Sequence, residues 1–381
     1  MIIRNLSRLL RHSKKSLLLL GPRQTGKSTL VRGLQPDLTI NLSDEATYLA
    51  FASNPREIYE RLEGQPCRTV FLDEIQRLPS LLNTLQAILD EDRFQIQLYL
   101  TGSSARKLRR GHANLLPGRL HTYVLGPLVA SELGYRVDAK KALAIGTLPG
   151  MWMEADQRQA EKSLRSYAAT YLKEEIQAEA LTRNVEGFSR FLLVAAAEAG
   201  KFLDLSKLAT QAGLPRQSVV RYVEILEDTL IIRRCEAFRK SLRRRLVQSP
   251  KFFFFDTGVL NGLLENFLVS ADRIGMLFEH LVFNQIVDSA QSQDKHIRVS
   301  SYRTEHGAEV DLVVELDNQV FAVEVKATSR VGRPDVRGLR SFADYVGNTH
   351  HPFLLHLGTE KKLIEGVRVL PWQEFLREVG L

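Results

Sequence analysis

The stretch Gly21-Pro-Arg-Gln-Thr-Gly-Lys-Ser28 follows a short apolar run, Leu17 to Leu20. Its spacing is G-x-x-x-x-G-K-[ST], in which the glycines let backbone N–H groups close around phosphate oxygens. An apolar run ended by glycine predicts a buried strand. The helix expected after the loop points its positive end at the same phosphates. We therefore predict a nucleotide-binding loop, because the alternative, a glycine turn on the surface, does not need the strand before it.

The expected ligand of this loop is ATP with Mg²⁺. Lys27 is expected to reach the β- and γ-phosphates, and Ser28 to bind the metal ion. The other residues expected to contact the nucleotide are Gly21, Pro22, Arg23, Gln24, Thr25, Gly26 and Thr29.

A second acidic motif, Val70-Phe-Leu-Asp-Glu74, ends another apolar run. Ligands of open α/β sheets bind at the carboxyl ends of the strands, so Asp73 is expected to hold Mg²⁺. Glu74 is expected to polarise the water that attacks the γ-phosphate. The stretch from Thr101 to Ser104 ends the next strand, and Ser103 is our choice for a hydroxyl that senses that phosphate. The alternative is a solvated acidic strand end.

Strands are also expected at residues 38–42 and 95–100, with a helix from Pro79 to Asp90. Strands alternating with helices predict an α/β fold with a parallel sheet covered on both faces.

These three motifs, with Ala105 after Ser104, resemble the AAA+ ATPases. Within that class they resemble a prokaryotic family that joins an AAA+ core to a conserved C-terminal domain of unknown function. The resemblance implies that Arg119, in the stretch from Asn114, is an arginine finger acting in a neighbouring subunit, and hence a homo-oligomer. An arginine near a γ-phosphate stabilises transition-state charge. The competing residues are Arg106, Arg109 and Arg110.

The stretch from Leu205 to Leu226 predicts two helices joined by a turn at Gly213-Leu-Pro215, with Ser206 capping the first. A strand expected from Leu230 and a basic hairpin follow, which resembles a winged helix. Eight cations and one acid lie between Arg233 and Lys251. DNA is therefore an expected partner, contacted by Arg216, Gln217, Ser218, Arg221, Arg239, Lys240, Arg243, Arg244 and Arg245. Two alternatives stay open, a protein-contact module and an edge strand protected by charge.

Two apolar runs flank the polar pair Asp317-Asn318, which predicts a β-hairpin. A two-residue turn places Asp311 opposite Glu324, with both side chains on one face. Opposed carboxylates repel unless a cation lies between them, and a divalent metal fits that need. The alternative is a structural hairpin in which Glu309 pairs with Lys326 and Glu324 faces solvent.

Upstream of the hairpin, Glu279 interrupts an otherwise apolar helix between Gly275 and Ile286, which is costly for an unpaired carboxylate. The set Glu279, Asp311, Glu324 and Lys326 resembles the PD-(D/E)XK nuclease superfamily, although Val310 stands in place of its proline. The resemblance implies that Glu279, Asp311 and Glu324 hold Mg²⁺, or Mn²⁺, while Lys326 orients or deprotonates a water.

Composition limits the class of protein. The 381 residues carry a net charge of +8, which permits a polyanionic partner. The only cysteines, Cys67 and Cys235, exclude a disulfide framework and fit the cytoplasm. No apolar run reaches membrane-spanning length, and the charged N-terminus is not expected to be a signal peptide.

Four domains are expected. They are an AAA+ ATPase core (1–128), a helical connector (129–200), a winged-helix-like unit (201–262) and a PD-(D/E)XK-like domain (263–381). The leading hypothesis is an ATP-hydrolysing, DNA-binding protein with a metal-dependent endonuclease domain. Branched DNA is one substrate class considered, although no residue identifies it. The alternative is an ATP-gated regulatory switch with an inactive nuclease-like domain.

Overall fold

The computed structural model describes residues 2–91, 94–103, 118–171, 184–238, 249–305, 307–347 and 350–381. The chain divides into two compact units. The first comprises Met1–Gly126 and Asp228–Leu230, and the second comprises Pro127–Glu227 and Ile231–Leu381. Among the helices within these ranges, none has the length and apolar character needed to cross a membrane.

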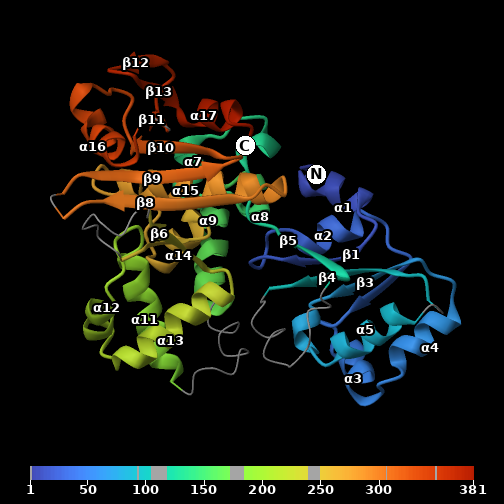
Figure 1. Cartoon of the computed structure of the whole chain (residues 1–381). Helices are drawn as coiled ribbons and strands as arrows, with labels where there is room; N and C mark the ends of the chain where they lie inside the picture. Colours follow the sequence, from blue (N-terminus) through green and yellow to red (C-terminus); the bar gives the residue numbers. More distant parts are fainter. Residues whose placement is uncertain are drawn as a thin grey trace. The chain divides into compact units, whose positions relative to one another are not determined.

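The first unit is built on a five-stranded sheet in the order β2-β3-β4-β1-β5 (Figure 1). Each neighbouring pair is parallel. The strands are β1 (Ser16–Leu20), β2 (Leu38–Asn41), β3 (Thr69–Asp73), β4 (Gln97–Gly102) and β5 (Leu120–Val124). The helices are α1 (Leu6–His12), α2 (Lys27–Arg32), α3 (Glu45–Ser53), α4 (Glu57–Gly64), η1 (Ile75–Arg77) and α5 (Leu81–Asp90).

Helices cover both faces of this sheet. Successive side chains of a strand point to opposite faces. Leu18 and Leu20 of β1 therefore join one apolar core with α3, α4 and α5, while Leu17 and Leu19 join a second core with α1 and α2. The predicted parallel α/β sheet is confirmed. Its order places β4 between β1 and β3, so the carboxyl ends of these three strands meet at one edge.

The second unit holds an eight-stranded mixed sheet in the order β12-β13-β11-β10-β9-β8-β6-β7. Its strands are β6 (Ile232–Ala237), β7 (Lys251–Phe254), β8 (Ile297–Arg303), β9 (Glu309–Leu316), β10 (Gln319–Lys326), β11 (His351–His356), β12 (Lys362–Ile364) and β13 (Val367–Pro371). One face packs on α15 (Ile274–Ser292) and the other on η4 (Arg333–Val336) and α16 (Arg337–Val346). The chain thus runs α15–β8–β9–β10–α16–β11 through the centre of this unit (Figure 1).

The remaining helices of the second unit precede α15, except the last. They are η2 (Ala130–Leu133), α7 (Ala139–Ile145), α8 (Pro149–Met153), α9 (Gln157–Ser166), η3 (Tyr167–Tyr171), α11 (Val185–Ala197), α12 (Leu205–Ala212), α13 (Arg216–Asp228), α14 (Thr257–Leu263) and α17 (Trp372–Glu378). In the expected helical connector, α9 is followed at Tyr167 by π-helical geometry, and residues 172–183 lie outside the described part.

The predicted helix-turn-helix corresponds to α12 and α13, joined through Gly213 in the left-handed region (φ 62°). The expected cap was wrong. Asp204, not Ser206, caps α12, because its carboxylate accepts the N–H groups of both Ser206 and Lys207. The strand expected from Leu230 begins at Ile232. It pairs antiparallel with β7 and parallel with β8, so the β6–β7 hairpin belongs to the eight-stranded sheet.

The predicted β9–β10 hairpin is confirmed, including its register. Asp317 (φ 49°) and Asn318 (φ 62°) form the two-residue turn, with both residues in the left-handed region. The observed pairs run from Gln319 opposite Leu316 to Val323 opposite Leu312, which puts Asp311 and Glu324 at the next position.

Candidate functional site

The predicted phosphate loop lies between β1 and α2, as its mechanism requires. Gly21 has a φ of 156°, and a Cβ atom at this position would lie 2.2 Å from the carbonyl oxygen of Leu125. Gly26 has a φ of 91°, a conformation that favours glycine. Both glycines of the motif are therefore required by the backbone path itself.

The side chain of Lys27 folds over this loop. Its Nζ donates to the carbonyl oxygens of Gly21 and Pro22, each at 2.8 Å. Behind the loop, the guanidinium of Arg4 donates to the carbonyl oxygens of Thr25 (2.6 Å) and Gly126 (2.8 Å). The loop is thus held in shape by two buried cations, and the sequence patterns gave no signal for Arg4.

A polar cluster connects the carboxyl ends of β3 and β4 to α2. The Ser28 hydroxyl donates to Asp73 Oδ1 at 2.8 Å, and the Thr101 hydroxyl donates to the same oxygen. Arg32 lies 3.6 Å from the other carboxylate oxygen of Asp73. The structure therefore brings together the two residues predicted to hold Mg²⁺. A hydroxyl and a carboxylate are oxygen ligands of the kind that Mg²⁺ prefers, so they fit that ion.

The predicted catalytic carboxylate, Glu74, follows β3 in a left-handed conformation (φ 60°) that is uncommon outside glycine. The buried amide of Gln76 donates through Nε2 to the Glu74 carboxylate and to Ser103 Oγ, the latter at 3.0 Å. The atom that contacts Glu74 must be the amide nitrogen of Gln76, because a carboxylate only accepts hydrogen bonds. Gln76 thus links Glu74 with the predicted sensor Ser103. Sequence reasoning missed it, although its position two residues after Glu74 was a usable signal.

We expect Gln76→Ala to lower kcat for ATP hydrolysis about tenfold, because Glu74 loses the donor that orients it. The dissociation constant for ATP should change by less than about twofold, since Gln76 is not expected to touch the nucleotide. Steady-state kinetics and equilibrium binding of a fluorescent ATP analogue check this. Asn83→Ala, which removes an exposed amide on α5, is the matched control. An unchanged kcat would contradict the positioning role.

The predicted arginine finger, Arg119, forms an exposed ion pair with Asp90 at 2.6 Å within its own unit. Its role in a neighbouring subunit stays a prediction. The competing residues Arg106, Arg109 and Arg110 lie outside the described part of the chain.

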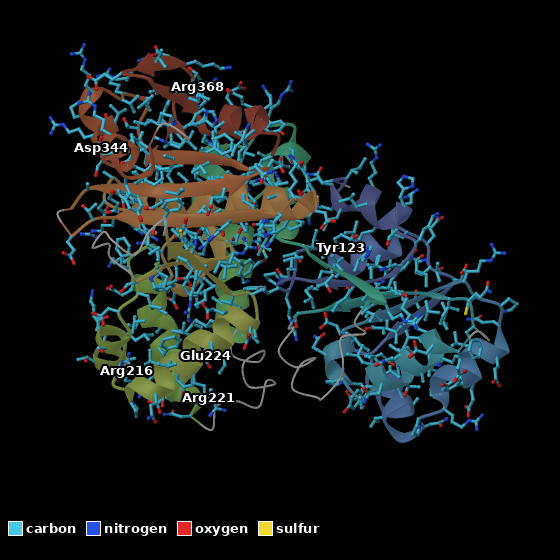
Figure 2. All side chains as sticks on the ribbon, in the orientation of Figure 1. Tyr123, Arg216, Arg221, Glu224, Asp344 and Arg368 are labelled. Carbon is cyan, nitrogen blue, oxygen red and sulfur yellow. The ribbon has the colours of Figure 1, made fainter. Side chains whose placement is uncertain are left out.

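Of the residues predicted to contact DNA, four lie on α13. Arg216, Gln217 and Arg221 are exposed and Ser218 is half-buried. Figure 2 labels Arg216 and Arg221 on this helix, where Glu224 is exposed as well. The other five, Arg239, Lys240, Arg243, Arg244 and Arg245, fall outside the described residues.

A pocket of about 1020 Å³ opens beside α12 and α13 in the second unit. Its basic lining residues are Lys201, Lys207, Arg216, Arg234, Lys251 and Arg303, and its acidic ones are Glu198, Asp204, Glu279 and Glu309. The guanidinium of Arg303 and the ammonium of Lys251 lie 5.0 and 5.3 Å from the ring centre of Phe202. The pocket is therefore lined both by residues of α12 and α13 and by the carboxylates of Glu279 and Glu309.

The acidic residues predicted for a nuclease site form one cluster with an unexpected member, Lys251. Its side chain is 5% exposed, and Nζ lies 2.8 Å from Glu279 Oε1 and 2.9 Å from Glu309 Oε1. Lys326 Nζ donates to Glu324 Oε1 at 2.6 Å, and Val325 N–H donates to Asp311 Oδ2 at 2.8 Å. The alternative hairpin, with Glu309 paired to Lys326 and Glu324 in solvent, is wrong.

Burial controls the protonation of this cluster. It raises the pKa of Glu279 to about 7 and that of Glu324 to about 8, and the nearby Asp311 adds to both shifts. Burial also raises the pKa of Asp311. Burial alone would lower the pKa of Lys251, but the carboxylates of Glu279, Asp311 and Glu309 raise it above its usual value. Lys251 is therefore held charged.

The cluster does not fit a metal ion in its present arrangement. Within the described ranges, no three carboxylate, histidine or cysteine side chains are placed to share one ion. The ammonium of Lys251 contacts Glu279, one of the predicted ligands, directly. The prediction that the opposed carboxylates need a cation agrees with the structure, but the cations present are the side chains of Lys251, Lys326 and Arg303. Lys251 was noted in the sequence only as part of the basic hairpin.

Three family models match successive parts of the chain. Residues 13–134 match an AAA domain, so the predicted P-loop domain of AAA type is confirmed. Residues 136–269 and 274–375 match two domains of unknown function, DUF8612 and DUF4143. The prediction of an AAA core joined to a conserved C-terminal domain of unknown function agrees with this order.

The similar proteins add little about activity. The uncharacterized protein Rv2008c of Mycobacterium tuberculosis is 26% identical over 327 residues, which is 84% of this chain and 71% of the relative. A crystal structure of Pif1 helicase from Candida albicans is 16% identical, covers 44% of this chain and 48% of its own, and has a TM-score of 0.27. This chain thus spans about half of that helicase. Protein VC1899 from Vibrio cholerae covers 96% of both chains at 10% identity, with a TM-score of 0.23.

Proposed function

We propose that the first unit binds Mg²⁺–ATP and hydrolyses it to ADP and phosphate. The observation that carries this proposal is the contact between Ser28 and Asp73, which joins the phosphate loop to the acidic strand end. Such a junction is what P-loop enzymes use to hold the metal ion of the nucleotide.

Each residue then has a task in hydrolysis. The loop N–H groups and Lys27 hold the phosphates, and Ser28 and Asp73 hold Mg²⁺, which neutralises phosphate charge when bound. Glu74 orients the attacking water and accepts its proton, while Ser103 contacts the γ-phosphate. Lys27 must leave the carbonyl oxygens of Gly21 and Pro22 to reach the nucleotide. Arg119 would complete the site of a neighbouring copy in a homo-oligomer.

The test is release of inorganic phosphate from ATP by the purified protein, with Mg²⁺ and with EDTA. Hydrolysis that requires Mg²⁺ and fails in Lys27→Ala supports the proposal. A protein that binds no ATP analogue at all would overturn it.

For the second unit we propose a DNA-binding role in the cytoplasm. The exposed Arg216 and Arg221, the basic pocket and the net charge of +8 support it. Phosphate contacts release counterions, so binding should weaken steeply with salt. A winged helix at 201–262 and a PD-(D/E)XK-like domain at 263–381 remain part of this proposal. The chain order α15–β8–β9–β10–α16–β11 supports the latter, because it carries Glu279, Asp311, Glu324 and Lys326 on the elements that the superfamily's motif requires.

We consider two functions for the C-terminal domain. One is Mg²⁺- or Mn²⁺-dependent cleavage of DNA. The other is an ATP-gated switch that binds DNA without cutting it. The contacts of Lys251 with Glu279 and Glu309 favour the switch, since a lysine already neutralises the carboxylates.

We expect no cleavage of linear, single-stranded or four-way-junction DNA with Mg²⁺ or Mn²⁺, with or without ATP. Gel assays of labelled DNA, run beside Asp311→Ala, measure this. Cleavage that disappears in Asp311→Ala would establish the nuclease instead, and the DNA that is cut would identify its substrate.

A further inference from the structure

The acidic cluster is assembled from two segments of the chain. Lys251 lies on β7, inside the segment 136–269 that matches one family model. Its partners Glu279 and Glu309 lie on α15 and β9, inside the segment 274–375 that matches the other. Lys251 reaches them because β7 pairs with β6, and β6 pairs with β8, which is the neighbour of β9. The C-terminal domain therefore receives its buried cation from the domain before it.

The charges show why a cation is needed at this place. Four carboxylates, of Glu279, Glu309, Asp311 and Glu324, share the cluster with the ammonium groups of Lys251 and Lys326. The more exposed guanidinium of Arg303 lies 3.8 Å from Glu309. Buried carboxylates persist when they are paired or bound to metal. Lys326 contacts Glu324, whereas Lys251 contacts Glu279 and Glu309. A lysine ammonium is a compact point charge, which can stand where a metal ion would.

A second observation is that the lysines leave one carboxylate oxygen of the cluster without a hydrogen-bond donor. Glu324 is 9% exposed, and its Oε2 has no hydrogen-bond partner among the described residues. Glu324 and Asp311 are the residues one position beyond the last pair of the hairpin, Val323 opposite Leu312. An oxygen acceptor without a partner, beside further carboxylates, is a ligand set suited to a hard divalent cation.

We infer that Lys251 is a built-in cation that occupies the place of a divalent metal between Glu279, Glu309 and Asp311. The native cluster then binds neither Mg²⁺ nor Mn²⁺ at millimolar concentration. Removing the ammonium takes away the charge that now holds these carboxylates, and we expect them to rearrange around a divalent cation. The inference rests on the same Lys251 contacts as the switch proposed for the second unit, and it does not depend on ATP hydrolysis. DNA cleavage tests the switch and Mn²⁺ binding tests the inference, so the failure of one is distinguishable from the failure of the other.

The experiment measures Mn²⁺ binding to the full chain without nucleotide, by electron paramagnetic resonance of the free ion. Lys251→Met keeps an unbranched apolar stem beside Phe202 and removes the charge. It is expected to bind one Mn²⁺ at least about tenfold more tightly than wild type, since one unit of repelling charge is gone. The double variant Lys251→Met/Asp311→Asn should lose this gain. Lys251→Arg, which keeps the charge, should not acquire the site.

The outcomes separate cleanly. Equal Mn²⁺ binding by wild type and a folded Lys251→Met protein would overturn the inference. So would Mn²⁺ binding by wild type that falls in Asp311→Asn, and this comparison stands even where Lys251→Met does not fold. Unchanged Mn²⁺ binding between wild type and Asp311→Asn, at the background level of the first unit, is the expected result.

Discussion

Lys27→Ala should lower the rate of ATP hydrolysis about a thousandfold, because the variant lacks the cation that stabilises charge on the transferring phosphate. The present contacts of Lys27 support this expectation. Its Nζ lies 2.8 Å from two carbonyl oxygens of the loop, so the ammonium already lies against the loop that is proposed to hold the phosphates. Phosphate release under saturating Mg²⁺–ATP measures the loss.

Lys14→Ala is the matched control for this variant. It makes the same substitution at an exposed lysine ahead of β1, and it should leave hydrolysis within about twofold of wild type. Thermal unfolding must be compared as well, since Lys27 is buried and holds the loop. Full activity of a folded Lys27→Ala protein would contradict the assignment of the phosphate loop.

The nucleotide site was largely predictable because its parts are local. The loop motif, the strand before it and the acidic strand end each span eight residues or fewer. The order of the strands in the sheet then brings these parts together. With β4 between β1 and β3, Thr101, the first residue of the hydroxyl-rich stretch noted in the sequence, lies beside Asp73. Gln76 was missed. Its position two residues after Glu74 placed it near the acidic motif, but its role appears only when Ser103 is brought next to it.

The carboxylate cluster shows where sequence reasoning reaches its limit. The hairpin register followed from a two-residue turn, and the opposed carboxylates implied a cation. The identity of that cation depends on long-range pairing, since Lys251 and Glu279 are 28 residues apart. Their contact requires β6 to join β8 in one sheet, and no periodicity in the sequence encodes that pairing. Pairing of distant strands is a property of the whole fold.

Glu74→Gln should separate ATP binding from hydrolysis. The amide cannot accept a proton from the attacking water, so kcat should fall at least about a hundredfold. Its carbonyl oxygen still accepts the hydrogen bond from Gln76, which keeps the local geometry. The dissociation constant of the ATP analogue should therefore stay within about twofold of wild type. Single-turnover hydrolysis and equilibrium binding, measured on the same preparation, give the two quantities.

Glu60→Gln, an equal change at an exposed position on α4, should alter neither quantity. A parallel loss of binding and hydrolysis in Glu74→Gln would mean that Glu74 shapes the pocket and does not act on water. Loss of hydrolysis alone would leave a protein locked with ATP, because the step after binding is blocked. Such a variant also discriminates between the roles proposed for the second unit. If DNA binding differs between ATP-bound Glu74→Gln and nucleotide-free protein, the nucleotide gates the second unit, as the switch hypothesis requires.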